Sequence, residues 1–196
     1  MSANTLPRLV LGSSSPRRLD LLKQIGITPA VVCAADINED PHKNELPQPY
    51  VVRLALEKNA VVAAQFPNDF IVTADTTVAV GRRIIGKPEN KADAEKMIRL
   101  LSGRAHCVHT GVAVRAPDGK VVSRISSSRL KAKRLSDVEI AAYLQSDEWH
   151  GVAGAYRIQG LFAQYFLTIQ GSPSGIIGLP LYETMQLLKG LGYHGH

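Results

Sequence analysis

Residues 8–26, RLVLGSSSPRRLDLLKQIG, contain the signals that decide the fold. Their apolar run, residues 9–11, has the length and composition of a buried strand, which a glycine and three serines then end. Pro16 predicts the first position of a helix, where its missing N–H costs nothing, and the preceding Ser15 is a favourable N-cap residue. We therefore expect a buried strand, a serine loop and an amphipathic helix that closes at Gly26.

Two arginines, Arg17 and Arg18, fall in the first turn of this expected helix. Free N–H groups and the positive end of the helix dipole already favour an anion there. Two guanidinium groups oppose the dipole, which is unfavourable for the helix and favourable for binding phosphate. The stretch matches neither a Walker A loop nor a GxGxxG turn, and serine, proline and basic residues also begin helices that bind nothing. We interpret it as a phosphate-binding loop.

The composition limits the class of protein. The 196 residues, 45% hydrophobic and 20% charged, fit one globular domain that spans residues 1–196. The net charge of +6 favours an anionic partner. No run of Lys or Arg exceeds two residues and aromatic residues make up only 6%, so a small polyanion is favoured over nucleic acid.

The two cysteines, Cys33 and Cys107, have no CxxC or Cys/His spacing. We therefore expect neither a zinc site nor a disulfide, but two buried, reduced thiols. The N-terminus has no signal-peptide pattern, and no apolar stretch approaches the length that spans a membrane. The expectation is a cytoplasmic protein with no membrane partner.

Strands and helices alternate along the rest of the chain, which indicates an α/β protein. The expected strands are residues 30–33, 70–80, 84–85, 107–116, 121–133 and 161–169. The expected helices are residues 50–65, 93–101 and 136–145, with a last helix after Gly178-Leu179-Pro180. Residues 36–49 and 172–175 are expected to be loops.

Asp75 and Lys58 occupy positions that are unusual for their residue types. Asp75 lies in the middle of the expected strand 70–80, where a buried carboxylate is costly unless a cation, a metal or a donor meets it. We interpret it as a metal ligand or a general base. Lys58 lies on the apolar stripe of helix 50–65, so its ammonium either extends past the core to solvent or points into a cleft.

The roles of three further features depend on how the chain folds. Lys87, between Gly86 and Pro88, is either an ordinary turn lysine or a cation held close to the hairpin that carries Asp75. Glu39, in the acidic loop 36–49, is a surface residue unless the fold returns it to the arginines. The small residues within the stretch 154–160 suit a backbone that approaches a ligand closely.

Eight short motifs occur in order along the chain. They are residues 13–18 (SSSPRR), 53–55 (RLA) with Lys58, 74–76 (ADT), 86–88 (GKP), 102–103 (SG), 154–156 (GAY), 158–160 (IQG) and 178–181 (GLPL). In this series the chain resembles the Maf family of nucleoside triphosphate pyrophosphatases, over nearly its whole length. The resemblance implies a fold similar to inosine triphosphate pyrophosphatases: a mixed, elongated sheet flanked by helices, with two lobes around a central cleft. It also implies a homodimer.

The resemblance also implies roles for individual residues. Asp75 matches the proton acceptor that activates water, and Glu39 matches an acidic position associated with metal binding. Five side chains match the set that contacts phosphate: Ser13, Arg17, Arg18, Lys58 and Lys87. Three positions match the branch that acts on dTTP and UTP, whereas the branch that acts on 7-methyl-GTP has Trp, Gln and Glu there: Arg17, Thr76 and Gln159.

The expected reaction is hydrolysis of dTTP and UTP to the monophosphate and pyrophosphate, as housecleaning of the nucleotide pool. A nucleoside triphosphate carries about four negative charges, which two arginines and two lysines would balance. Asp75 and Glu39 would suffice, with phosphate oxygens, to hold Mg²⁺ or Mn²⁺. The alternatives are a pyrophosphatase for 7-methyl-GTP or other modified nucleotides, and a non-catalytic regulatory or nucleic-acid-binding protein linked to cell division.

Overall fold

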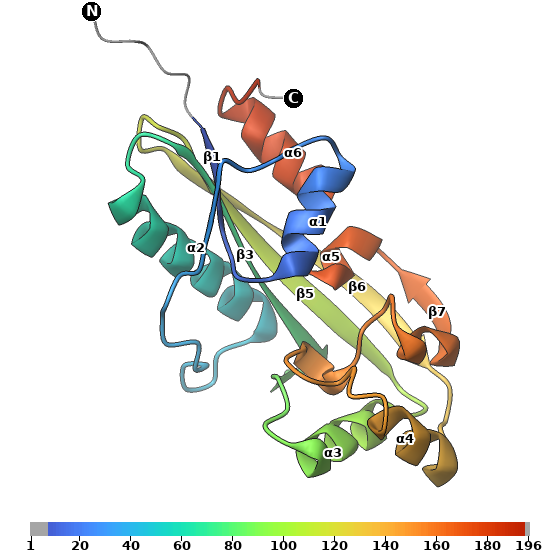
Figure 1. Ribbon diagram of the computed structural model, residues 1–196. Helices are drawn as coiled ribbons and strands as arrows, with labels where there is room; N and C mark the ends of the chain where they lie inside the picture. The colour runs from blue at the N-terminus through green and yellow to red at the C-terminus, as the bar shows by residue number, and fades with distance from the viewer. Residues whose placement is uncertain (1–7, 195–196) are drawn as a thin grey trace, which may run out of the picture.

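A seven-stranded mixed sheet forms the centre of the structure, a computed structural model that describes residues 8–194 (Figure 1). The strand order is β2-β1-β3-β5-β6-β7, and the short β4 pairs with β3. β1 pairs in parallel with β2 and β3, and the other pairings are antiparallel. The strands are β1 (Leu9–Gly12), β2 (Val31–Cys33), β3 (Phe70–Val80), β4 (Arg83–Ile85), β5 (Ala105–Arg115), β6 (Val121–Ala132) and β7 (Phe166–Gln170).

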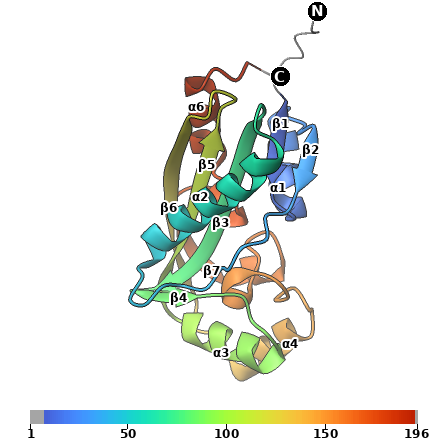
Figure 2. The ribbon, with the colours of Figure 1, turned by 90° about the vertical axis from the view of Figure 1, so that its left-hand side faces the viewer.

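Helices cover both faces of the upper part of the sheet, and two more pack at its lower end (Figures 1 and 2). α2 (Pro47–Gln65) lies on one face, where it buries apolar side chains of β1 and β3. α1 (Pro16–Gln24) and α6 (Leu181–Gly190) cover the other face. The remaining helices are α3 (Lys91–Leu101), α4 (Asp137–Leu144) and the short α5 (Pro173–Ile177). The predicted sheet flanked by helices is confirmed.

Gly111 explains how closely α2 approaches the sheet. It lies in β5 opposite Asp75, and a Cβ atom added there would lie 2.4 Å from the carbonyl oxygen of Val51. No real side chain tolerates that distance, so only glycine lets the first turns of α2 pack directly on β5. The close packing keeps the later turns of α2 beside the middle of β3.

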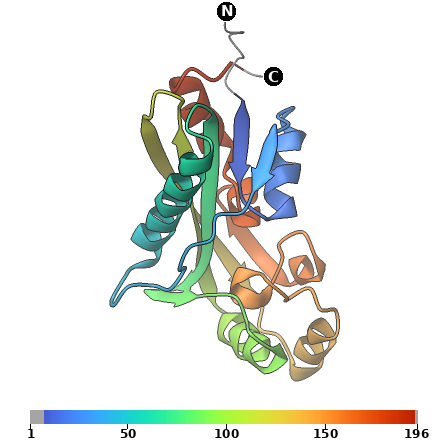
Figure 3. The same cartoon turned by 60° about the vertical axis from the view of Figure 1, so that its left-hand side comes forward.

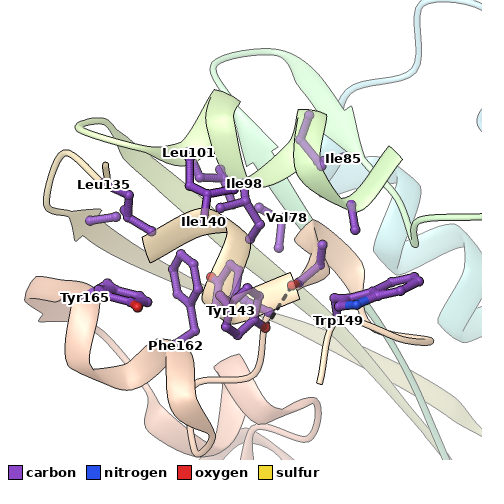
Figure 4. Packing of buried hydrophobic residues seen from close by; sticks show 14 of the residues in the cluster. Val78, Ile85, Ile98, Leu101, Leu135, Ile140, Tyr143, Trp149, Phe162 and Tyr165 are labelled. Carbon is purple, nitrogen blue, oxygen red and sulfur yellow. Dashed lines mark hydrogen bonds between the residues drawn. The ribbon is translucent and has the colours of Figure 1, made fainter. Parts of the chain in front are cut away.

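Two clusters of buried apolar residues form the cores of two lobes, as expected (Figure 3). The upper cluster joins β1, α1, α6 and the first half of β3. The lower cluster joins α3, α4, residues 149–166 and the lower halves of β3 and β5. At its centre Phe162 is fully buried, with its ring centroid 5.0 Å from that of Tyr143, whose hydroxyl donates to the Ala155 carbonyl at 3.0 Å (Figure 4).

Two expectations about local structure are wrong. Residues 161–169 are not one strand: Leu161–Tyr165 forms the 3₁₀ helix η2, and β7 begins only at Phe166. The reason is burial of Phe162 and Tyr165 in the lower cluster, which turns both rings to one side. Residues 172–175 are not a loop but begin α5, whose N-cap Ser172 accepts a hydrogen bond from the Gly175 N–H at 3.0 Å.

Smaller expectations need adjustment. Ser15 occupies the N-cap position of α1, but its side chain makes no capping hydrogen bond. The expected helix 50–65 begins earlier, at Pro47. Cys33 and Cys107 are free thiols and only partly buried. Within residues 8–194, no helix is both long and apolar enough to cross a membrane.

Candidate active site

A gap in the sheet places the candidate site. On one side, β3 pairs with β1 through residues 70–72 and with β4 through residues 78–80. In the described part of the chain, residues 73–77 have no strand neighbour on that side, although β5 pairs with them on the other. The loops after β1 and β4 border this gap, and side chains from both faces of the sheet reach it. It lies at the carboxyl end of the parallel strand β1, where open α/β sheets commonly bind ligands.

A cavity of about 340 Å³ fills the gap between the two lobes. It falls within the range of small-molecule sites. Every site residue predicted from the sequence lines it: Ser13, Arg17, Arg18, Glu39, Lys58, Asp75, Thr76, Lys87 and Gln159. Arg157 lines it as well, so five cationic and two acidic side chains face one cavity. This charge balance suits a polyanionic ligand.

Two carboxylates on the α2 side of the cavity share one ammonium group. Lys58 Nζ lies 2.6 Å from Asp75 Oδ1 and 2.6 Å from Glu39 Oε1. Lys58 and Asp75 are each only 7% exposed, so the lysine points into the cavity and the alternative of a solvent-directed side chain is wrong. The fold also returns the loop of Glu39 to the site, where the Tyr50 hydroxyl donates to the Glu39 carbonyl at 2.8 Å.

The pKa values of the two carboxylates shift in opposite directions. Burial raises the pKa of Asp75 above its ordinary value, and this effect exceeds the lowering by the nearby charges of Lys58 and Arg18. Partial burial also acts to raise the pKa of Glu39, but hydrogen bonds and charge from Lys58 and Lys87 hold it below its ordinary value. A raised pKa brings the Asp75 carboxylate closer to the operating pH, which favours a role as general base.

Arg18 lies on the opposite side of the cavity and is bound only by neutral groups. Its Nε donates to the Gly178 carbonyl at 2.8 Å, Nη1 donates to Ser13 Oγ at 3.1 Å, and Nη2 donates to Thr76 Oγ1 at 3.4 Å. Gly178 has φ of 136°, a conformation that favours glycine. No carboxylate of the described chain forms an ion pair with Arg18. Burial lowers its pKa, and its charge is left for a ligand.

The hydroxyl groups behind Arg18 form a directed chain. Thr110 Oγ1 donates its single proton to the Gly175 carbonyl at 2.7 Å. At the 2.9 Å contact between the two threonines, Thr76 must then be the donor and Thr110 the acceptor. Thr76 Oγ1 consequently presents only lone pairs, one of which accepts from Arg18. This chain fixes the orientation of both side chains.

Arg157 is a cavity residue that sequence reasoning did not single out. It lies in the lower lobe, between η1 (Ala153–Ala155) and η2. Burial lowers the pKa of Arg17, and the positive charge of Arg157 lowers it further. The signal in the sequence was one arginine among the small and apolar residues of the stretch 154–160, and only the fold shows what it faces.

Lys87 and Gln159 complete the rim. Lys87 lines the same cavity as Asp75, with its Nζ 3.5 Å from Glu39 Oε2, and its side chain is 59% exposed. Gln159 lies on the lower-lobe side and is exposed. In residues 8–194, no group of three or more His, Cys, Asp or Glu side chains could hold a metal alone. Any cation bound here would also need oxygen atoms from a ligand.

Comparisons with known proteins identify the family of the chain. Residues 8–191 match the family model described as Maf-like protein. A protein of Caulobacter vibrioides named dTTP/UTP pyrophosphatase is 54% identical over 95% of this chain and 97% of its own. Its namesakes in Paramagnetospirillum magneticum and Cereibacter sphaeroides are each 52% identical over 94% of this chain and at least 95% of their own.

Two solved structures are more distant likenesses. The Ham1 protein of Staphylococcus aureus is 16% identical with a TM-score of 0.45, over 63% of this chain and 71% of its own. A nucleoside-triphosphatase, dITP/XTP pyrophosphatase, of Mycobacterium abscessus is 14% identical with a TM-score of 0.43, over 93% of each chain. The family match over nearly all of the sequence and the close relatives are decisive: the chain belongs to the family of Maf-like proteins.

Proposed function

We propose that this protein is a nucleoside triphosphate pyrophosphatase that hydrolyses dTTP and UTP to the monophosphate and pyrophosphate, as housecleaning of the nucleotide pool. The names of relatives that are about half identical support the substrate class. The observation that carries the proposal is one cavity that contains a buried carboxylate, Asp75, together with Arg17 and Arg18, which form no ion pair with a carboxylate of residues 8–194. This combination suits water activation beside a triphosphate.

In the proposed reaction, Asp75 accepts a proton from a water molecule whose oxygen attacks the α-phosphorus. The bond from the α-phosphorus to the bridging oxygen breaks, and its electron pair leaves with pyrophosphate. Arg17, Arg18 and Lys87 stabilise the charge that develops on the leaving group, because they are placed before the reaction and need no reorganisation. Ser13 keeps Arg18 directed at the phosphates, through the 3.1 Å hydrogen bond at Nη1.

The residues present fit a divalent cation such as Mg²⁺ or Mn²⁺. Carboxylate oxygens of Glu39 and Asp75 converge on one point, now the ammonium of Lys58, and hard oxygen donors are what such cations prefer. Glu39 and Asp75 would hold the cation together with phosphate oxygens of the substrate. When bound, it supplies charge neutralisation at the phosphates.

Arg17, Thr76 and Gln159 are the proposed specificity residues, and all three line the cavity. An amide such as Gln159 both donates and accepts, which suits the edge of a uracil or thymine ring. We also propose that the protein acts in the cytoplasm as a homodimer of a single domain. Light scattering during gel filtration tests the dimer.

The test is pyrophosphate release from a panel of nucleotides: dTTP, UTP, CTP, GTP, ITP and 7-methyl-GTP, each with Mg²⁺ and with a chelator. Metal-dependent release from dTTP and UTP is expected. Turnover of 7-methyl-GTP or ITP instead would keep the chemistry and overturn the specificity assignment. No turnover of any nucleotide, with salt-sensitive binding to a nucleic acid, would replace the enzyme with a binding protein.

A further inference from the structure

Arg17 and Arg157 approach the cavity from opposite lobes. Arg17 is in the first turn of α1, which belongs to the upper cluster, and Arg157 follows η1 in the lower cluster. The backbone that leads into Arg157 is held firmly, because Tyr156 is 5% exposed and Ala155 is fully buried. The position of Arg157 is therefore set by the core of the lower lobe and not by a free loop.

Neither arginine has an acidic partner among residues 8–194. Nη2 of Arg157 donates to the His150 carbonyl at 3.4 Å, and its Nε is buried without a hydrogen-bond partner in the described chain. A nearby carboxylate, that of Glu148, is instead used by the Leu161 N–H at 2.7 Å. Arg157 thus retains donor groups and a charge that no other residue of the range 8–194 pairs with.

Arg53 shows how this chain neutralises an arginine that does not line the cavity. Its Nη2 lies 2.7 Å from Glu45 and its Nη1 lies 3.0 Å from Glu57. Arg17 and Arg157, by contrast, line one cavity, and neither forms an ion pair with an acid of residues 8–194. Such an arrangement is unfavourable in the free protein and is relieved by an anion, and the planar fork of each guanidinium matches phosphate oxygens.

We propose that Arg157 is a substrate-binding residue that holds, together with Arg17, one phosphate group of the nucleoside triphosphate across the two lobes. The proposal rests on the proposed function for the identity of the ligand. It adds a contact from the lower lobe, because the other proposed phosphate-contacting residues come from α1, α2 and the loops after β1 and β4. Substrate binding would then draw the two lobes together.

Binding of inorganic tripolyphosphate, measured by calorimetry, tests the proposal without catalysis. Arg157→Ala should weaken binding by about ten- to a hundredfold, since hydrogen bonds between charged groups are lost. The matched control is Arg82→Ala, which removes the same charge from the exposed turn between β3 and β4 and should change binding by less than about twofold. Arg157→Lys, which keeps the charge but not the fork, should fall between them.

A structural role for Arg157 gives a different pattern. If the residue only anchors the His150 carbonyl, Arg157→Ala should lower the melting temperature of the free protein and bind tripolyphosphate as the wild type does, which would overturn the proposal. We expect the free variant to melt no lower than wild type, because repulsion from Arg17 is removed. Should Arg157→Ala fail to fold, Arg157→Gln, which removes the charge but keeps a longer polar side chain, serves for the same comparison.

The experiments distinguish a failure of the Arg157 proposal from a failure of the proposed function. Wild-type hydrolysis of dTTP with unchanged tripolyphosphate binding and unchanged KM in Arg157→Ala would remove Arg157 from the site and leave the proposed function standing. Loss of tripolyphosphate binding in this variant, in a protein that hydrolyses no nucleotide, would keep the anion contact and remove the enzyme.

Discussion

The two sides of the cavity differ in how their charged side chains are paired. On the α2 side, the carboxylates of Asp75 and Glu39 are neutralised within the free protein by the ammonium of Lys58. On the α1 side, Arg18 is bound by two side-chain hydroxyls and a carbonyl, and Arg17 has no ion pair among the described residues. The charges on the α2 side are neutralised without a ligand, whereas the arginine charges on the α1 side would be neutralised only by a bound anion.

This difference indicates that the α1 side binds the phosphate groups and that the α2 side carries out the chemistry. Free guanidinium charge on the α1 side favours binding of a phosphate group. The paired α2 side keeps a carboxylate buried and ionisable, with its pKa raised by burial, next to where the phosphate would lie. Variants of the α2 side should therefore change turnover most, and variants of the α1 side should change affinity.

The largest effect is expected for Asp75→Asn. Loss of the proton acceptor should lower kcat by about 10²- to 10⁴-fold, whereas dTTP should still bind because the arginines are unchanged. Steady-state kinetics and calorimetry measure the two quantities. The matched control is Asp69→Asn, a second buried aspartate just before β3 that pairs with Arg8 at 2.8 Å and lies outside the cavity.

Asp69→Asn should leave kcat unchanged. Equal losses of turnover in the two aspartate variants would show that buried acids of this region act through stability alone. Lys58 keeps Glu39 as a partner in Asp75→Asn, so this variant should fold, and its melting temperature verifies that it does.

On the acid side, the sequence singled out Asp75, whereas it left Glu39 as a surface residue unless the fold returned its loop to the site. β3 is apolar on both faces, so its bounds were predicted correctly, and a lone aspartate in such a strand has few structural explanations. Periodicity placed Lys58 on the buried stripe of α2 but left two directions for its ammonium. Its partner in β3 decides between them, and a helical pattern does not contain that information.

The structure of the lower-lobe side of the cavity could not be predicted from the sequence. The aromatic run of residues 161–166 has the composition of a strand, and burial of Phe162 and Tyr165 in one core instead gives η2. The path of the preceding loop, and with it the place of Arg157, depends on that packing. The roles of Thr76 and Gln159 came from the family resemblance, and these assignments stay predictions.

A moderate effect on affinity is expected for Thr110→Val, which sharpens the comparison from the α1 side. The variant removes the acceptor of the Thr76 proton, so Thr76 can turn and no longer holds its lone pair toward Arg18. The KM for dTTP should rise by about three- to tenfold, the value of one neutral hydrogen bond, with a smaller change in kcat. Thr110→Ser keeps the hydroxyl and should restore the wild-type KM; an equal rise in both variants would mean that packing at this buried position, and not the hydroxyl chain, is responsible.

The smallest effect is expected for Glu45→Gln, which removes a charged partner of Arg53 outside the cavity and should change the stability of the fold. Hydrogen bonds from Arg53 lower the pKa of Glu45 from 4.5 to about 2. A folded pKa below the unfolded one means that this carboxylate stabilises the protein above pH 4.5 and loses its contribution as the pH falls toward 2. The variant should therefore be less stable by about 1 kcal/mol at pH 7, with a gap that narrows as the pH falls from 4.5 to 3 in urea unfolding. A gap that is constant with pH would assign the loss to packing. Because Arg53 is paired in the free protein, its acid partner changes stability and not dTTP affinity, whereas the cavity arginines should show the reverse.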